Sequence, residues 1–380
     1  MRVTIVSPAW PYRGGIAAFT ERLAVELQRE GHQVKIYTFT LQYPGFLFPG
    51  KTQYTSSPKP EDLQIERQLS SVNPWTWISL GRRIRKEQPD LLLVAYWMSF
   101  MAPSLGTMCR VVRRNKHTRI LGIMHNLLPH ERKLGDKLFA RYMVGALDGV
   151  VALSQSVCDE AHLFRPELPT VASPHPLYDN FGEPATREES CRQLGLDTDC
   201  RYLLFFGLIR DYKGLDWLLE AFAKLKKTPA SNENATSVKL IIAGEFYGKS
   251  EQYFEQAKAL GLEDSLVWKS EFVPDSDVRY YFGAADLIVQ PYKTATQSGV
   301  TQIAYHFLKP MLVTRVGGLA EIVPDGKVGY SVEPNVEAIA AALQDFVTHS
   351  DNDTRFLEGL IEEKKKYAWD KMTHAILSLT

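Results

Sequence analysis

Short apolar runs alternate with longer amphipathic segments along almost the whole chain. The runs that predict strands are residues 3–7, 32–39, 90–96, 119–125, 149–154, 170–175, 201–207, 238–244, 265–270, 286–291 and 310–316. Continuous Val, Ile and Leu strands separated by helices are typical of parallel sheets covered on both faces. The alternation stops over residues 177–198, which we interpret as a linker with a short helix. We therefore expect two doubly wound α/β domains in series, with ligands at the carboxyl ends of the strands.

One stretch, residues 91–109, carries no charged side chain and has about the length of a transmembrane helix. Its first part, LLLVAYW, has the composition of a strand, and Pro103 and Gly106 interrupt the remainder. A strand, a loop and the start of a helix explain this stretch better than a membrane span. Residues 43–60 are rich in Pro, Gly and aromatic side chains and predict a loop.

The segment LLFFGLIRDYKG, residues 203–214, has the composition of an anion-binding turn. An apolar strand ends at Gly207, and Arg210 and Lys213 follow just before Gly214 and an amphipathic helix. Two cations beside the positive end of a helix dipole would attract a diphosphate. The Arg fork can bind two phosphate oxygens, and Lys acts as a point charge. An ordinary strand–loop–helix with two solvated cations is the alternative interpretation.

A second loop of this kind lies roughly ninety residues further on, in QSGVTQIAYHFLKP, residues 297–310. Ser298 and Thr301 offer hydroxyl groups on either side of Gly299, where a helix begins. Backbone amides at that helix start could bind anionic oxygens. A serine N-cap would explain the local sequence equally well. Two such loops at the ends of neighbouring strands of one domain favour a nucleotide diphosphate site.

Charge is balanced over the 380 residues, with 44 Lys and Arg and 44 Asp and Glu, but the halves differ. Residues 1–180 contain 22 basic and 15 acidic side chains, and residues 181–380 contain 22 and 29. The basic clusters are Arg82, Arg83, Arg85 and Lys86, and Arg110, Arg113, Arg114 and Lys116. They suggest an anionic partner such as acidic lipid headgroups, a lipid phosphate or nucleic acid, although solvated helix faces would also explain them. No nucleic-acid-binding motif accompanies the clusters, so we expect no nucleic acid partner.

The four cysteines, Cys109, Cys158, Cys191 and Cys200, lack the paired spacing of a zinc site. The chain opens directly with a strand-like segment instead of a signal peptide. A reducing cytoplasm is therefore the expected location. No Asp-x-Asp pair lies in a setting that indicates a bound metal, and we expect no metal site.

Several motifs, in order along the whole chain, resemble those of the retaining family 4 (group 1) glycosyltransferases. They are SPAWPYRGGIAAF (7–19), FFGLIRDYKG (205–214), LIIAGE (240–245), VTRVGGLAEIVPDGKVGY (313–330) and YAWDKMTHAIL (367–377). The resemblance implies the GT-B fold, α/β with two doubly wound Rossmann-like domains facing across a cleft. It also implies an acceptor-binding domain over residues 1–180, a nucleotide-sugar-binding domain over residues 181–365, and a terminal helix at about 366–380 that crosses back to the first domain.

The activity implied by this resemblance is transfer of a sugar, with retention, from a nucleotide-diphosphate sugar to a glycan or lipid-linked acceptor. The donor would be a UDP- or GDP-sugar, with no metal and no further cofactor. Peripheral contact with an anionic membrane through the N-terminal domain would place the enzyme at the inner face of the cell membrane. Alternatives are a catalytically silent GT-B subunit that binds nucleotide sugar and a nucleotide-sugar epimerase of the same fold.

Residue roles follow by matching the motifs. The catalytic residues would be His125, Arg210 and Lys213. The donor-binding residues would be Gly14, Gly15, Gly207, Gly244, Val273, Ser298, Gly299, Val300, Thr301, Gln302 and Glu321. The acceptor-binding residues would be Asn126, His130 and Glu131. Each assignment has a simpler alternative. His125 could be a structural histidine, Gly14 and Gly15 could form a plain turn, and His130 and Glu131 could be a pair at a helix start.

One feature departs from the family pattern. Thr296 and Gln302 (or Ile303, depending on alignment) stand where the family usually has two glutamates. The loss of the first acid puts the contact with the donor sugar hydroxyls in doubt and keeps the catalytically silent alternative open.

Overall fold

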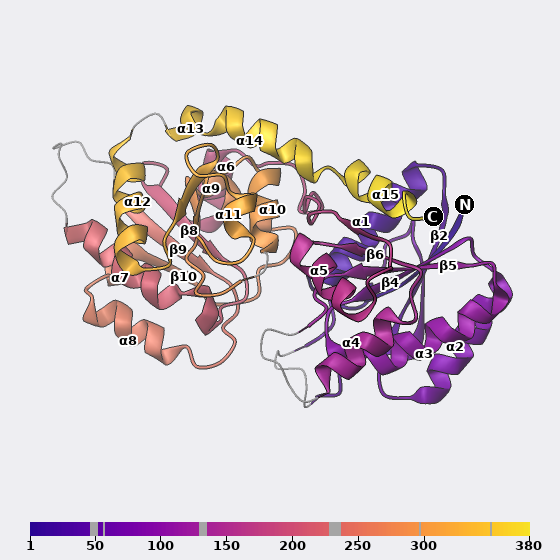
Figure 1. Cartoon of the computed structure of the whole chain (residues 1–380). Helices are drawn as coiled ribbons and strands as arrows, with labels where there is room; N and C mark the ends of the chain where they lie inside the picture. The colour runs from indigo at the N-terminus through magenta and orange to yellow at the C-terminus, as the bar shows by residue number, and fades with distance from the viewer. Residues whose placement is uncertain (46–51, 56–57, 129–134, 228–236, 296–297, 350–351) are drawn as a thin grey trace. The chain divides into compact units, whose positions relative to one another are not determined.

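The computed structural model describes residues 1–45, 52–55, 58–128, 135–227, 237–295, 298–349 and 352–380 (Figure 1). The chain divides into two compact units. The first contains Met1–Pro176 and Tyr367–Thr380, and the second contains Leu177–Lys366. Each unit is built on one parallel sheet with helices against it, which confirms the predicted fold class.

The sheet of the first unit has seven strands in the order β3-β2-β1-β4-β5-β6-β7. Its strands are β1 (Arg2–Val6), β2 (Gln33–Leu41), β3 (Gln64–Ser70), β4 (Leu91–Tyr96), β5 (Arg119–Met124), β6 (Gly149–Ala152) and β7 (Thr170–Ala172). Strand β3 was not predicted. It is an edge strand that pairs with β2 alone, and only Ile65 and Leu69 of its seven residues are large apolar side chains facing inward.

Side chains of this sheet alternate between two apolar cores. Leu91 and Leu93 join the core with α1 (Gly15–Arg29) and α15 (Trp369–Leu377), whereas Leu92 and Val94 join the opposite one. The helices of that opposite core are α2 (Pro74–Glu87), α3 (Ala102–Val112), α4 (Asp136–Val144) and α5 (Gln155–Phe164) (Figure 1). The sheet is therefore covered on both faces, as its continuous apolar strands predict.

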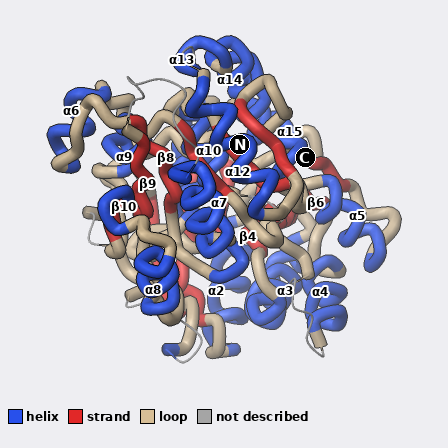
Figure 2. The backbone as a smooth tube through the Cα atoms, turned by 90° about the vertical axis from the view of Figure 1, so that its left-hand side faces the viewer, coloured by secondary structure: helices blue, strands red, loops and turns tan. Residues whose placement is uncertain are grey.

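The second unit has a six-stranded sheet in the order β10-β9-β8-β11-β12-β13. Its strands are β8 (Arg201–Phe206), β9 (Val238–Ala243), β10 (Leu266–Lys269), β11 (Leu287–Gln290), β12 (Met311–Thr314) and β13 (Gly329–Val332). Its helices are α6 (Arg187–Leu194), α7 (Leu215–Lys227), α8 (Glu251–Ala259), α9 (Val278–Ala284), α10 (Gly299–His306), α11 (Leu319–Ile322), α12 (Val336–Thr348), α13 (Asn352–Arg355) and α14 (Leu357–Lys364). Helices α7 and α12 lie side by side (Figure 1, Figure 2).

The uncharged stretch at residues 91–109 forms strand β4, a short 3₁₀ turn at Ser99–Met101 and the first part of α3. Across the described part of the chain, no helix combines the length and the apolar character needed to cross a membrane. This agrees with the interpretation of that stretch as a strand followed by a helix start.

Candidate active site

Glycines shape the first anion-binding loop of the second unit. Strand β8 is followed by Gly207 at φ 95° and then by Gly214 at φ 69°, just before α7. A Cβ at Gly214 would lie 2.0 Å from the carbonyl oxygen of Pro291, which follows strand β11. Only glycine fits that contact, because any side chain would collide with backbone. The loop is thereby pressed against the carboxyl end of the neighbouring strand.

Lys213 is a buried cation, and no acidic side chain that the structure describes pairs with it. Its exposed fraction is 9%, and no ion pair or hydrogen bond reaches its ammonium group from the described residues. The nearby Lys293, in contrast, pairs with Asp216 at 2.8 Å and Asp211 at 3.5 Å. Burial lowers the pKa of Lys213, and the charge of Arg210 lowers it further. An uncompensated buried ammonium group is a site that an anion would stabilise.

Arg210 and Lys213 each lie against an aromatic ring. The Arg210 guanidinium carbon lies 3.9 Å from the centroid of the Tyr247 ring, and the buried Nε of this side chain finds no hydrogen-bond partner in the described part of the chain. Lys213 Nζ lies 5.5 Å from the ring centroid of Tyr292. Cation–π contacts of this kind hold a charge in place without neutralising it.

The second loop starts helix α10 through its hydroxyl side chains. Ser298 Oγ accepts a hydrogen bond from the Val300 amide at 3.2 Å, and Thr301 Oγ1 donates to the Ser298 carbonyl at 2.6 Å. The Ser298 hydroxyl also lies 3.2 Å from that of Tyr292. The serine therefore acts as an N-cap, the local alternative named above, and this role links the helix start to the tyrosine beside Lys213.

Four of the predicted residues meet at the carboxyl edge of the sheet. A Cβ at Gly207 would lie 3.3 Å from Lys213 Nζ and 3.7 Å from Val300 Cγ2. A Cβ at Gly244, which has φ 146°, would lie 2.1 Å from the Gly207 carbonyl oxygen. The two loops and the ends of β8 and β9 thus converge around one buried ammonium group.

Other predicted donor residues of this unit lie around the same edge with different exposure. Val273 follows β10 and is buried, and Glu321 is exposed on the short helix α11. Gln302 is completely buried, as is Thr301, and both amide atoms of Gln302 lack a hydrogen-bond partner in the described structure. A Cβ at Gly299 would lie 2.8 Å from Tyr178 Cε2, so the ring of Tyr178 packs closely against the helix start.

The predicted residues of the first unit lie at the ends of β1 and β5. His125 follows β5 and donates its backbone amide to the Tyr96 carbonyl at 2.9 Å, while its buried Nε2 has no hydrogen-bond partner among the described residues. Its ring packs edge-on against Phe19, which also contacts His175. Burial, with a smaller contribution from His175, lowers the pKa of His125 to about 3. The imidazole is therefore neutral at physiological pH.

Gly14 and Gly15 stand at the start of α1, and both are exposed. Gly14 has φ 112°, and no atom lies within 4 Å of a Cβ built on it, so the backbone there is open to close approach. Asn126 is half-buried after His125. The remaining candidates, His130, Glu131 and Thr296, lie outside the described residues.

The two basic clusters of the first unit are partly used within the fold. Arg83 pairs with Glu66 at 2.8 Å and with Glu87 at 3.3 Å, and Arg113 pairs with Asp148. Other members are exposed: Arg82, Arg85, Lys86, Arg114 and Lys116. Solvated cations thus make up part of each cluster. The rest are engaged within the fold, Arg83 and Arg113 in ion pairs and Arg110 in hydrogen bonds to the carbonyls of Gly106 and Tyr142.

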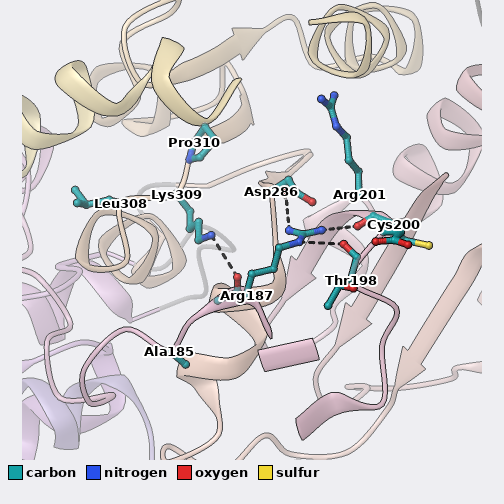
Figure 3. Close-up of a pocket in the computed structure, with 11 residues that line it drawn as sticks. Ala185, Arg187, Thr198, Cys200, Arg201, Asp286, Leu308, Lys309 and Pro310 are labelled. Atoms are coloured by element: carbon teal, nitrogen blue, oxygen red, sulfur yellow. Dashed lines mark hydrogen bonds and ion pairs between the residues drawn. The ribbon is translucent and has the colours of Figure 1, made fainter. Parts of the chain in front are cut away.

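A polar hollow of about 460 Å³ lies at the opposite edge of the second sheet, where β8, β11 and β12 begin (Figure 3). Arg187 crosses it and donates to Asp286 Oδ1 at 2.8 Å and to the carbonyl of Cys200 (Figure 3). Lys309 Nζ donates to the Gly283 carbonyl at 3.4 Å. These groups are satisfied by the protein itself, and they lie far along the strands from the anion-binding loops, so the hollow is structural.

Sequence reasoning missed the two rings on which the cations rest. Tyr247 lies after β9 and Tyr292 after β11, and each follows a strand end by only a few residues. That position is the one signal that could have identified them, because side chains there gather at the carboxyl edge of a parallel sheet.

Comparison with known proteins agrees with this architecture. A family model described as "Glycosyl transferases group 1" matches residues 186–365, and one described as "Glycosyltransferase Family 4" matches residues 13–178. An uncharacterized glycosyltransferase of Methanocaldococcus jannaschii is 25% identical over 98% of this chain and 96% of its own length. A D-inositol 3-phosphate glycosyltransferase of Pseudarthrobacter chlorophenolicus is 25% identical over 84% of this chain and 78% of its own.

Solved structures share the whole fold at low identity. Sucrose-phosphate synthase from Thermosynechococcus elongatus has a TM-score of 0.75 and 16% identity, covering 99% of this chain and 98% of that one. HepE of Anabaena, solved with UDP and glucose, has a TM-score of 0.71 and 15% identity, covering 100% and 98%. With the two family models covering both units, the chain belongs to the group 1, family 4 glycosyltransferases and has their GT-B fold.

Proposed function

We propose that this glycosyltransferase takes its sugar from a nucleotide-diphosphate sugar bound at the carboxyl edge of the second sheet. The observation that carries the proposal is the buried ammonium group of Lys213, which has no acidic partner among the described residues and has Gly207 and Val300 beside it. A diphosphate supplies the missing negative charge, and the glycine leaves room for its oxygens. Solved relatives support the donor class, since HepE of Anabaena was solved with UDP and with UDP-glucose.

In the proposed reaction, the bond between the anomeric carbon and the diphosphate oxygen breaks, and an acceptor hydroxyl oxygen forms the new bond to that carbon. The acceptor proton passes to the departing phosphate. Arg210 and Lys213 stabilise the charge that develops on the leaving group, which is the role of preorganised electrostatics. We propose retention of the anomeric configuration and no metal requirement, because two fixed cations can perform the neutralisation that a metal performs elsewhere. Neutral His125 would contact the donor sugar.

We propose a glycan or a lipid-linked saccharide as the acceptor, bound by the first unit through residues near His125 and Asn126. The exposed part of the basic clusters, Arg82, Arg85 and Lys86 together with Arg114 and Lys116, supports peripheral contact with anionic lipid. A cytoplasmic enzyme at the inner face of the membrane would meet such an acceptor there.

The test is calorimetric titration of UDP, GDP and ADP in EDTA into the wild type, Lys213→Ala and Lys258→Ala. Lys258 is an exposed lysine of α8 and serves as the matched control. We expect one diphosphate to bind the wild type and the control equally, and Lys213→Ala to bind it roughly 5- to 150-fold more weakly. Binding of none of the three, or equal binding by Lys213→Ala, would refute the site.

Turnover then tests the reaction itself. The diphosphate that binds identifies the base of the donor, and its sugar conjugates are offered with saccharide acceptors in EDTA. NMR of the product anomeric proton should show the configuration of the donor. Inverted product would contradict retention, and activity that returns only on adding a divalent cation would contradict metal independence.

A further inference from the structure

The contact between Arg210 and Tyr247 has a role beyond packing. We infer that Tyr247 is a positioning residue: its ring holds the face of the Arg210 guanidinium and leaves the in-plane N–H groups free for the oxygens of a nucleoside diphosphate. The inference rests on the nucleotide site proposed above and adds a residue that acts on that site through Arg210.

Arg210 makes no polar side-chain contact among the described residues. No carboxylate pairs with it, and none of its five N–H groups donates a hydrogen bond within the described residues. Two other arginines of this unit pair with carboxylates: Arg187 with Asp286 at 2.8 Å and Arg315 with Glu333 at 3.1 Å. Arg210 is half-buried, and yet within the described part of the chain its donors remain unused. A guanidinium that must bind phosphate needs those donors free.

The contact that Arg210 does make is with the face of an aromatic ring. The 3.9 Å separation places the guanidinium carbon over the Tyr247 ring. A ring attracts a cation through its face, whereas a carboxylate would occupy the N–H edge and cancel the charge. An aromatic partner therefore fixes the direction of the side chain while it preserves both the charge and the hydrogen-bonding edge.

Backbone pairing fixes Tyr247 beside Arg210. Beyond the ends of β8 and β9, Ile209 and Phe246 form a parallel bridge. The Ile209 amide donates to the Glu245 carbonyl at 2.9 Å, and the Tyr247 amide donates to the Ile209 carbonyl at 2.8 Å. These bonds extend the pairing of the strands by a few residues and hold positions 210 and 247 side by side.

An aromatic cluster in turn anchors this extension. The ring of Phe246 stacks on Tyr253 at 5.7 Å and lies 6.2 Å from Trp268, which contacts Phe254 at 4.6 Å. Tyr247 itself is 37% exposed, so its ring contributes little to the core. A partly exposed aromatic ring on a well-anchored backbone is suited to holding another side chain.

The experiment compares Tyr247→Ala, Tyr247→Phe and Phe254→Ala, each titrated with whichever of UDP, GDP and ADP binds the wild type. Phe254, 40% exposed in the same cluster, is the matched control because it does not contact Arg210. We expect Tyr247→Ala to weaken binding roughly 3- to 30-fold, since that is the range of a partly desolvated cation–π contact. Tyr247→Phe keeps the ring and should bind within about 2-fold of the wild type.

A double-mutant cycle separates positioning from direct contact with the ligand. If Tyr247 acts through Arg210, Tyr247→Ala should cause no further loss in the Arg210→Ala background, and binding of the matching nucleoside, followed by ligand-observed NMR, should not change. An undiminished loss in that background, or weaker nucleoside binding, would mean that the ring contacts the ligand directly and would overturn the inference. So would wild-type affinity in Tyr247→Ala. Failure of the wild type to bind any diphosphate would instead refute the nucleotide site, and the inference with it.

Discussion

Among single residues, two lysines of the second unit differ in whether they have acidic partners. Lys293 pairs with Asp216 and Asp211, whereas Lys213 has no acidic partner among the described residues and lies near the ring of Tyr292 and the charge of Arg210. A paired lysine stabilises the fold and attracts no ligand. An unpaired buried lysine costs folding free energy and attracts an anion, which is how sites of function often reduce stability.

This cost can be measured in Lys213→Met, which replaces the ammonium group with an apolar side chain of similar length. We expect the free energy of unfolding at pH 7 to rise by about 1 kcal/mol while nucleoside diphosphate binding is lost. Because burial lowers the pKa of Lys213, the wild type should gain stability as pH rises above that pKa, and the advantage of the variant should shrink. Urea unfolding at pH 7 and pH 10 measures both effects. A variant less stable than the wild type at pH 7 would contradict this account.

A second prediction at this scale concerns the buried imidazoles of the first unit. Burial lowers the pKa of His175 to about 4 and that of His125 to about 3, both below the ordinary value of 6.5. The unfolded chain therefore binds more protons between these values, and stability should fall as pH decreases below 6.5.

Replacing one imidazole should make that decline shallower. For His175→Gln, we expect the slope between pH 6 and pH 4 to decrease by about 1 kcal/mol per pH unit. His374→Gln, at an exposed position of α15, is the matched control for a histidine-to-glutamine replacement in the same unit. Denaturant unfolding at several pH values is the measurement, and equal slopes in the wild type and His175→Gln would show that His175 titrates normally.

At the scale of elements, the strand ends are set by close backbone contacts. A Cβ at Gly244 would lie 2.1 Å from the Gly207 carbonyl oxygen, so Gly244→Ala must push β9 away from the turn after β8. We expect a loss of roughly 3–5 kcal/mol of stability or failure to fold. Gly248→Ala shares the positive φ, 115°, but meets no atom within 4 Å, and should cost about 1 kcal/mol. Thermal unfolding distinguishes the two, and similar losses would mean that φ strain, not the contact, makes glycine necessary.

Elements were predictable from the sequence where apolar residues run continuously. Strands β1, β4, β5, β8 and β9 have that pattern and were found, because both faces of each strand are buried. Strand β3 was missed, since an edge strand with polar residues carries a weak signal. The loop with Gly207 and Lys213 was predicted from local composition. The pairing of Arg210 with Tyr247 could not be, because it joins positions 37 apart through a bridge that only the fold creates.

In the molecule as a whole, the C-terminal segment packs against the N-terminal part of the chain. Residues 367–380 belong to the first unit, where Trp369, Met372 and Ile376 complete the core beneath α1. The Trp369 ring lies 5.4 Å from that of Phe19 and 5.0 Å from the Arg22 guanidinium. The first unit is thus closed by the last segment of the chain, and its stability depends on both termini.

The packing of α15 in this core should make the stability of the first unit depend on Trp369. Trp369 is 4% exposed, so Trp369→Ala should destabilise the first unit by about 3–5 kcal/mol. Trp75, 80% exposed in the same unit, is the matched control, and Trp75→Ala should change stability by less than about 0.5 kcal/mol. Hydrogen exchange resolved along the sequence should show faster exchange over residues 1–176 in Trp369→Ala and unchanged exchange over residues 177–366. Equal loss of protection in both units would show that they unfold cooperatively. In that case α15 would stabilise the second unit as well as the first.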